Sequence, residues 1–257
     1  MGTETKASWM VLFSLHFRRC FRSTYGLMYF LIAILINMLF SMVGIFGGPT
    51  PLSAQRALNS ESFLRVHNIE LALLITSYPY ILPVLSVVGV LGVTYFFSSD
   101  RSSGFYEYIL ASEDFSIKDI YISYAFSTIV IISMILAINI GITTLALYII
   151  YGDVPSYMLG LIAVYSLPIT YISGLLLTLS MLTWTSLSKT YSGLNAPGGI
   201  GTIVGIAPPT AFLVINNFIV VNNLYLYSII YCLFIFIVLV ALFSVSIKKM
   251  SCERMLA

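Results

Sequence analysis

Charged residues are scarce in this chain of 257 residues: Asp, Glu, Lys and Arg make up 9%, against about 25% in a soluble globular domain. Three cysteines and a net charge of +2 exclude a disulfide-held scaffold and a basic nucleic-acid-binding protein. A hydrophobic content of 59% and a mean hydropathy of +0.99 exclude a disordered chain. The composition therefore indicates an integral membrane protein.

Signatures of catalysis are also missing. A Walker A loop requires a Gly-Lys pair, and the chain contains none, so it has no such ATP site of its own. His16 and His67 both lie outside the long apolar segments, and no segment carries two acidic residues. We therefore predict that the chain is not an enzyme and has no catalytic residue, metal site or cofactor of its own.

Long uncharged runs predict the membrane helices. A helix needs about 20 apolar residues to cross the hydrocarbon core. The runs between charged residues hold six such segments, the last two separated by a short stretch rich in asparagine. We predict an all-α integral membrane protein with one domain over residues 1–257 and six transmembrane helices, at residues 25–46, 70–97, 119–150, 156–185, 199–219 and 225–247.

Basic residues predict the orientation, because cytoplasmic loops carry an excess of Lys and Arg. Of the 12 basic residues, only Arg56 and Arg65 fall on the side opposite the termini. We predict a multi-pass protein of the cell (plasma) membrane, with both termini cytoplasmic and an external loop at residues 47–68.

Residues 8–22, before the first predicted span, have the pattern of an amphipathic helix. Apolar side chains recur at spacings of four, four and three: Trp9, Phe13, Phe17 and Cys20. The basic residues fall largely on the opposite side: Arg18, Arg19 and Arg22. This pattern predicts a helix lying in the cytoplasmic interface. The alternative is a basic anchor that fixes the topology by charge alone.

The cytoplasmic loop at residues 98–118 is the most informative polar stretch. Phe105, Tyr108 and Ile109 share a helical face, which predicts a short helix after Gly104. Ser116 stands three residues before Asp119, the spacing of a capping box that would begin the third span. A compact polar connector without further function is the alternative interpretation.

The pattern Asp100-Arg101-x-x-Gly104-x-x-Glu107-x-Ile109-Leu110-x-Ser112 resembles the cytoplasmic loop of permease subunits of type-2 (ABC-2) ATP-binding-cassette transporters. The six predicted spans, the internal termini and the helix before the first span are also similar to that family's plan. The sequence departs from the family at two places: Glu113 stands where a proline is usual, and Asp100 stands where Glu is commoner.

The resemblance implies a membrane-spanning subunit of an ATP-driven exporter that forms the path for an apolar or amphiphilic substrate. Its implied partners are a second permease copy or homologue and separate cytosolic ATPase subunits, which would bind ATP and magnesium. The residues implied to couple the subunits are Arg101, Gly104, Glu107, Tyr108 and Leu110. Two alternatives stay open: a self-contained secondary transporter or channel, and a membrane scaffold or immunity protein that binds a peptide.

Prolines interrupt three of the predicted spans, and each removes a backbone donor. They are Pro79, Pro83, Pro168, Pro208 and Pro209. Kinks are predicted there, and broken helices line gates in some transporters, although proline is also tolerated in membrane helices generally. Gly201 and Gly205 have the small-residue spacing that allows two helices to pack closely.

Overall fold

A computed structural model describes residues 8–46, 69–93, 100, 103–111, 115–183, 199–218 and 224–249, and the regular structure in these ranges is entirely helical. The elements are α1 (Ser8–Arg22), α2 (Thr24–Phe46), α4 (Ile69–Val88), α6 (Phe105–Ala111), α7 (Ile117–Tyr151), α8 (Ser156–Leu161), the π-helix η1 (Ile162–Ser166), α9 (Leu167–Thr183), α10 (Gly199–Phe218) and α11 (Leu224–Lys249). The predicted external loop at 47–68 lies outside these ranges.

Four helical stretches in the described part of the chain are long and apolar enough to cross a membrane. They are Thr24–Ser41, Ile117–Ile150, Ser156–Ser180 and Tyr225–Val245. Two more apolar stretches, Ser77–Val93 and Ile203–Ile215, are shorter. The prediction of an all-α protein with apolar membrane helices is confirmed at this level.

Two of the six predicted segments are not single regular α-helices. In the segment predicted at 70–97, α4 ends at Val88, and Gly89 and Val90 instead donate to carbonyls three residues back. The segment predicted at 156–185 contains α8, η1 and α9 in succession. A proline just after η1, discussed below, accounts for this second interruption.

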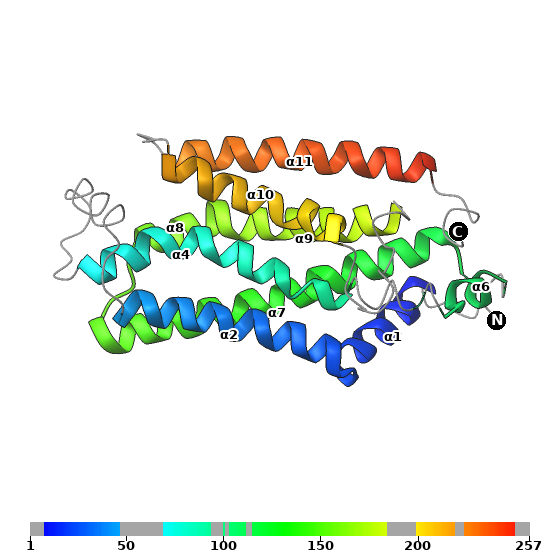
Figure 1. Ribbon diagram of the computed structural model, residues 1–257, viewed down its shortest axis with the longest axis horizontal. Helices are drawn as coiled ribbons and strands as arrows, with labels where there is room; N and C mark the ends of the chain where they lie inside the picture. The colour runs from blue at the N-terminus through cyan, green and yellow to red at the C-terminus, as the bar shows by residue number, and fades with distance from the viewer. Residues whose placement is uncertain are drawn as a thin grey trace, which may run out of the picture.

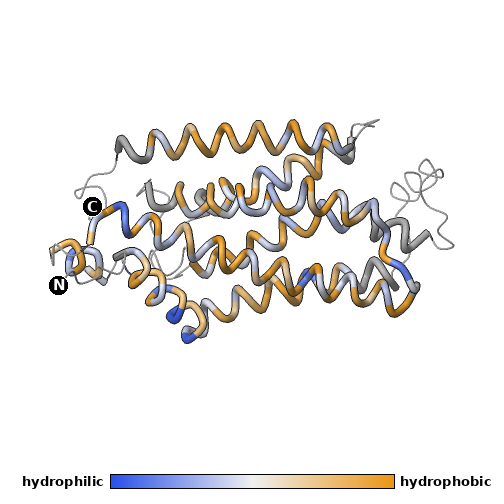
Figure 2. The backbone as a smooth tube through the Cα atoms, turned by 180° about the vertical axis from the view of Figure 1, so that it is seen from behind, coloured by the Kyte–Doolittle hydropathy of each residue, from blue (hydrophilic) through white to orange (hydrophobic). Residues whose placement is uncertain are grey.

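The helices form an elongated bundle with α11 along one long side and α2 along the other (Figure 1). Between them, α9 packs against α7, α10 and α11, while α4 packs against α2 and α10. Helices α1 and α6 lie at the same end of the bundle as the last turn of α11 (Figure 1). Strongly hydrophilic residues lie mainly near the two ends, whereas the long helices are largely apolar (Figure 2).

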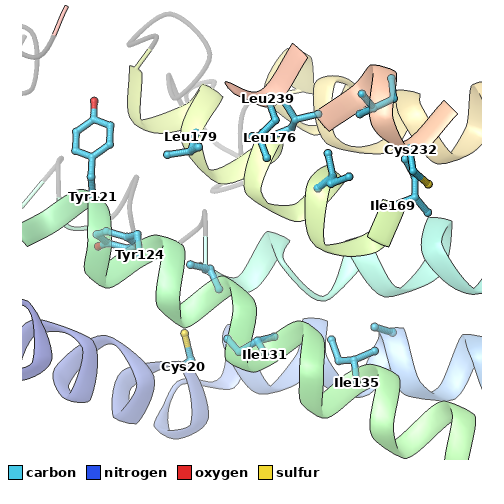
Figure 3. Close-up of a cluster of buried hydrophobic side chains, with 14 of the residues drawn as sticks. Cys20, Tyr121, Tyr124, Ile131, Ile135, Ile169, Leu176, Leu179, Cys232 and Leu239 are labelled. Atoms are coloured by element: carbon cyan, nitrogen blue, oxygen red, sulfur yellow. The ribbon is translucent and has the colours of Figure 1, made fainter. Parts of the chain in front are cut away.

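The outer side of α11 shows how the bundle meets its surroundings. Leu233, Phe234 and Ile237 are each more than half exposed. On the inner side, Cys232 and Leu239 pack against Ile169, Leu176 and Leu179 of α9 (Figure 3). Apolar side chains on both sides of a helix are typical of a membrane protein, in which one side packs and the other faces lipid.

Hydroxyl groups inside the bundle are mostly paired with the backbone of their own helix. The hydroxyl of Thr170 donates to the carbonyl of Ser166, and that of Thr178 donates to the carbonyl of Gly174. Thr178 also contacts Thr128 of α7 at 2.7 Å between hydroxyl oxygens. This local pairing satisfies the hydroxyl groups of Thr170 and Thr178 within apolar helices.

Candidate functional site

A buried carboxylate joins the elements at one end of the bundle. Asp100 is fully buried, and one of its oxygens accepts a hydrogen bond of 2.5 Å from the guanidinium of Arg19 on α1. Its other oxygen accepts a hydrogen bond of 2.8 Å from Tyr124 on α7, whose hydroxyl accepts one of 2.7 Å from Tyr106 on α6. We call Arg19, Asp100, Tyr106 and Tyr124 the carboxylate network. It connects α1 to the consecutive helices α6 and α7, with 81 residues separating Arg19 from Asp100.

His16 packs against this network from α1. Its Nδ1 lies 3.6 Å from Asp100 Oδ2, and its ring centroid lies 4.1 Å from that of Tyr124. Burial, followed by the charge of Arg19, lowers the pKa of His16 to about 3. The imidazole is therefore neutral at pH 7, and Arg19 is the positive charge that pairs with Asp100.

Burial also controls the ionisation of two neighbouring groups. It raises the pKa of Asp100, while the Tyr124 hydroxyl and the Arg19 guanidinium act in the opposite direction. It raises the pKa of Cys20 on α1 to about 12, so this residue stays a thiol at neutral pH. A buried thiol of this kind is a packing residue and not a nucleophile.

Helix α6 is held against the bundle by one side only. It begins after Gly104, whose φ of +72° favours glycine, and it buries Tyr106 and Ile109. On the other side, Tyr108 is 78% exposed and Glu107 is exposed as well. The short helix after Gly104 is confirmed, but the face predicted from the sequence is wrong for Tyr108. Tyr106 is the inward aromatic residue because its hydroxyl reaches Tyr124.

The structure describes only some of the other residues of the loop at 98–118. Leu110 is half-buried against the apolar core, whereas Arg101 lies outside the described residues. The capping box is confirmed: Asp119 N donates to Ser116 Oγ at 3.2 Å, and Ser116 N donates to Asp119 Oδ2 at 2.9 Å. This cap fixes the first turn of α7, five residues before Tyr124.

Sequence reasoning missed the carboxylate network. The basic side of α1 was predicted to include Arg19, but this side chain turns inward to Asp100. A usable signal was present: Leu12, His16 and Cys20 follow one another at intervals of four and form the most buried line of α1. The helix packs on α7 along this side, with Trp9 and Phe13 both against Phe126.

The predicted kink prolines form a second cluster, deeper in the bundle. Pro83 has no N–H, so it leaves the carbonyl of Pro79 one turn earlier without its helical donor. The hydroxyl of Ser166 in η1 donates to that carbonyl at 2.6 Å. A side chain of a neighbouring helix thus replaces the bond that the proline removes.

Pro168 likewise removes a backbone donor from the helical stretch formed by α8, η1 and α9. It leaves the carbonyl of Val164 without a helical donor, and the turn preceding it widens into the π-helix Ile162–Ser166. The thiol of Cys232 on α11 lies 3.9 Å from this carbonyl oxygen. A proline next to a π-helix is a recognised cause of a kink.

Pro209 of α10 is bonded from the same π-helix, and Pro208 is bonded from α11. Tyr231 donates to the carbonyl of Pro208 at 2.6 Å, and Tyr165 donates to that of Pro209 at 3.5 Å. The ring of Phe212 lies between these tyrosines, at centroid distances of 4.5 Å and 4.8 Å. The structure therefore brings the prolines of α4, α9 and α10 together around η1, an arrangement that their positions in the sequence did not reveal.

The pairing of Ser166 with Pro79 predicts a specific non-additive effect. Ser166→Ala is expected to lower the free energy of unfolding by about 1–3 kcal/mol, because a buried carbonyl loses its donor. In a Pro83→Ala background the backbone N–H at position 83 can donate to the carbonyl of Pro79. Ser166→Ala is then expected to lower the free energy of unfolding by less. Thermal unfolding of the two single variants and the double variant measures the coupling.

Ser244→Ala is the matched control, because that hydroxyl is exposed and donates only to the carbonyl of Val240 within α11. An equal cost of Ser166→Ala in both backgrounds would contradict the role assigned to the Ser166 hydroxyl.

Neither cluster has the composition of a metal site, and no group of three or more His, Cys, Asp or Glu residues lies together in the part of the chain that the structure describes. Comparisons of the chain with models of protein families, with curated proteins and with solved structures found no match in any of the three.

Proposed function

We propose that the chain is the membrane-spanning subunit of an ATP-driven exporter, and that α6 is the helix through which separate cytosolic ATPase subunits act on it. The observation that carries the proposal is the construction of α6. One side is fixed to α1 and α7 through Tyr106, while Glu107 and Tyr108 stand free on the other side at one end of the bundle.

The proposed topology has six spans, with both termini and α6 on the cytoplasmic side. The bounds of α2, α4, α7, α10 and α11 and of the α8–η1–α9 stretch support the number of spans. The excess of Lys and Arg on the side of α1 and α6 supports the orientation. In this orientation α1 lies at the cytoplasmic interface, where its exposed Met10, Val11 and Leu15 meet lipid.

A helix held in this way can transmit displacement. A force applied to Glu107 and Tyr108 reaches Tyr124 through Tyr106, and from there it reaches the first turns of α7. Helix α7 packs against α9, which continues from η1 and its surrounding prolines. ATP-driven movement of α6 would then change the bend of α4, α9 and α10 and open the path for an apolar or amphiphilic substrate.

The test is affinity purification of the full chain from its native membrane in mild detergent, followed by mass spectrometry and an ATPase assay. The expected result is co-purification of a Walker-containing subunit with ATPase activity. Glu107→Lys and Tyr108→Ala are expected to reduce the amount of that subunit severalfold, because both residues lie on the free side of α6.

Tyr148→Ala is the matched control, since this tyrosine is 62% exposed near the far end of α7. It should leave the co-purified ATPase unchanged. Recovery of the chain alone in several detergents would contradict the proposal and favour a secondary transporter, a channel or a scaffold protein. Equal losses for Tyr108→Ala and Tyr148→Ala would contradict the role of α6.

A further inference from the structure

Polar side chains gather between α2, α4 and α7 at a depth where the surrounding residues are apolar. Asn37 and Asn139 are each 1% exposed, and Ser86 is fully buried. The carbonyl oxygen of Asn37, both amide atoms of Asn139 and the hydroxyl of Ser86 have no hydrogen-bond partner among the described protein atoms. We call Asn37, Ser86 and Asn139 the polar layer.

A contact between α2, α4 and α7 bounds the polar layer on the side nearer to α1. A Cβ placed on Gly89 of α4 would touch the end of Ile135 on α7 and would lie 3.3 Å from the Cβ of Ala33 on α2. These three residues therefore meet at one level. Asn37 and Asn139 each follow by four residues on their helices, and Ser86 precedes Gly89 by three.

A second contact between the same three helices bounds the polar layer on the opposite side. Ser41 of α2 and Thr143 of α7 lie 2.9 Å apart between hydroxyl oxygens, and Thr143 donates to the hydroxyl of Tyr78 on α4 at 3.0 Å. Ser41 and Thr143 again follow Asn37 and Asn139 by four residues. At a rise of about 1.5 Å per residue, Asn37 and Asn139 lie about 6 Å along their helices from either contact. Ser86 lies about 4.5 Å from the Gly89 contact, on the same side of it as the two asparagines.

The donors and acceptors of the polar layer are complementary but are not bonded to one another. Asn37 uses its amide nitrogen on the carbonyl of Ala33 at 2.8 Å and keeps an acceptor. Asn139 offers two donors and an acceptor, and Ser86 offers one donor and an acceptor. Polar groups that share a level without direct bonds are typically bridged by water, and a buried water makes about three hydrogen bonds.

We propose that the polar layer is a hydration site, which holds at least one water molecule bonded to Asn37, Ser86 and Asn139 between α2, α4 and α7. The water accepts from the amide of Asn139 and the hydroxyl of Ser86 and donates to the carbonyl oxygen of Asn37. This satisfies side chains whose burial in an apolar environment is otherwise costly. The inference does not depend on the proposed function of the chain.

Radiolytic hydroxyl-radical footprinting of the purified full chain in lipid nanodiscs tests the site, because bound water generates radicals beside buried side chains. Tyr78 lies in the contact next to the polar layer and is 2% exposed, while Tyr165 is fully buried beside η1. Oxidation of Tyr78 is expected to be severalfold faster than that of Tyr165. Asn139→Leu is expected to reduce it to the rate of Tyr165.

Asn139→Leu also gives a second readout, the thermal midpoint of unfolding. This midpoint is expected to change in opposite directions for a hydrated and for a dry site. Loss of the water leaves Asn37 and Ser86 unsatisfied, so Asn139→Leu is expected to lower the thermal midpoint by about 3 °C or more. In a dry site the variant removes two unsatisfied atoms and raises the midpoint. Thr144→Val is the control, because Thr144 donates to Ile140 within α7, and both readouts should stay unchanged.

Equal oxidation of Tyr78 and Tyr165 in the unmodified chain would overturn the proposal, as would a midpoint raised by Asn139→Leu. The comparison within the unmodified chain requires no variant, so the test is decisive even if Asn139→Leu fails to fold.

Discussion

Asp100→Ala is expected to lower the free energy of unfolding by about 2–4 kcal/mol, because it removes a buried carboxylate that accepts two hydrogen bonds, one of them from the partly exposed guanidinium of Arg19. The change removes the carboxylate that accepts from both the guanidinium of Arg19 and the hydroxyl of Tyr124. It also releases α1 from α7 at the point where α6 is attached. Thermal and denaturant unfolding of the detergent-solubilised chain measures the loss.

Two comparisons separate the ion pair from a general effect of mutation. Asp153→Ala removes an exposed acid in the turn after α7 and is expected to change stability by no more than about 0.5 kcal/mol. Combining Asp100→Leu with Arg19→Met should cost less than the sum of the two single changes, because the hydrogen bond between the two residues can be lost only once. A double variant as unstable as the sum of its parts would contradict the pairing of Arg19 with Asp100.

Gly205→Ala is expected to destabilise the contact of α9 with α10 by about 1–3 kcal/mol through overpacking. A Cβ at position 205 would lie 2.6 Å from the Cβ of Leu177, an atom next to the backbone of α9 that cannot swing aside. The two helices would have to separate. Thermal unfolding of the variant, monitored by the loss of the helical circular dichroism signal, measures the effect.

Gly141→Ala on α7 is the matched control, since nothing lies within 4 Å of a Cβ at that position. Alanine there is expected to be neutral or to stabilise the helix by about 0.5–1 kcal/mol. A Gly205→Ala variant as stable as Gly141→Ala would contradict the close approach of α9 and α10. Gly174 makes a weaker test, because the atom that a Cβ would meet is the terminal methyl of Ile132, which can move.

Local features were predictable from the sequence because their causes lie within a few residues. The apolar runs predicted where the long helices occur, and the Ser116–Asp119 spacing predicted the start of α7. The glycine at position 104 predicted where α6 begins. Each of these depends on helix length, capping or a backbone angle, which neighbouring residues determine.

Long-range partners were not predictable in the same way. Helical spacing gives the direction of a side chain around its own axis but not the element that it meets. Arg19 could equally have faced water, and only the packing of α1 on α7 brings it to Asp100, 81 residues later. The pairing of Ser166 with Pro79 similarly depends on how η1 lies against α4, across 87 residues.

The separation of Arg19 from Asp100 also affects how the chain is made. At a synthesis rate of about 5–20 residues per second, the 81 residues between the two take about 4–16 s to add. During that interval the carboxylate that Arg19 binds has not yet been made, so the guanidinium cannot form this ion pair. Helices α2 and α4 are therefore synthesised before α1 can dock through Asp100. Completion of the carboxylate network requires Tyr106 and Tyr124 as well, so the nascent chain closes this end of the bundle only after α7 has begun to emerge.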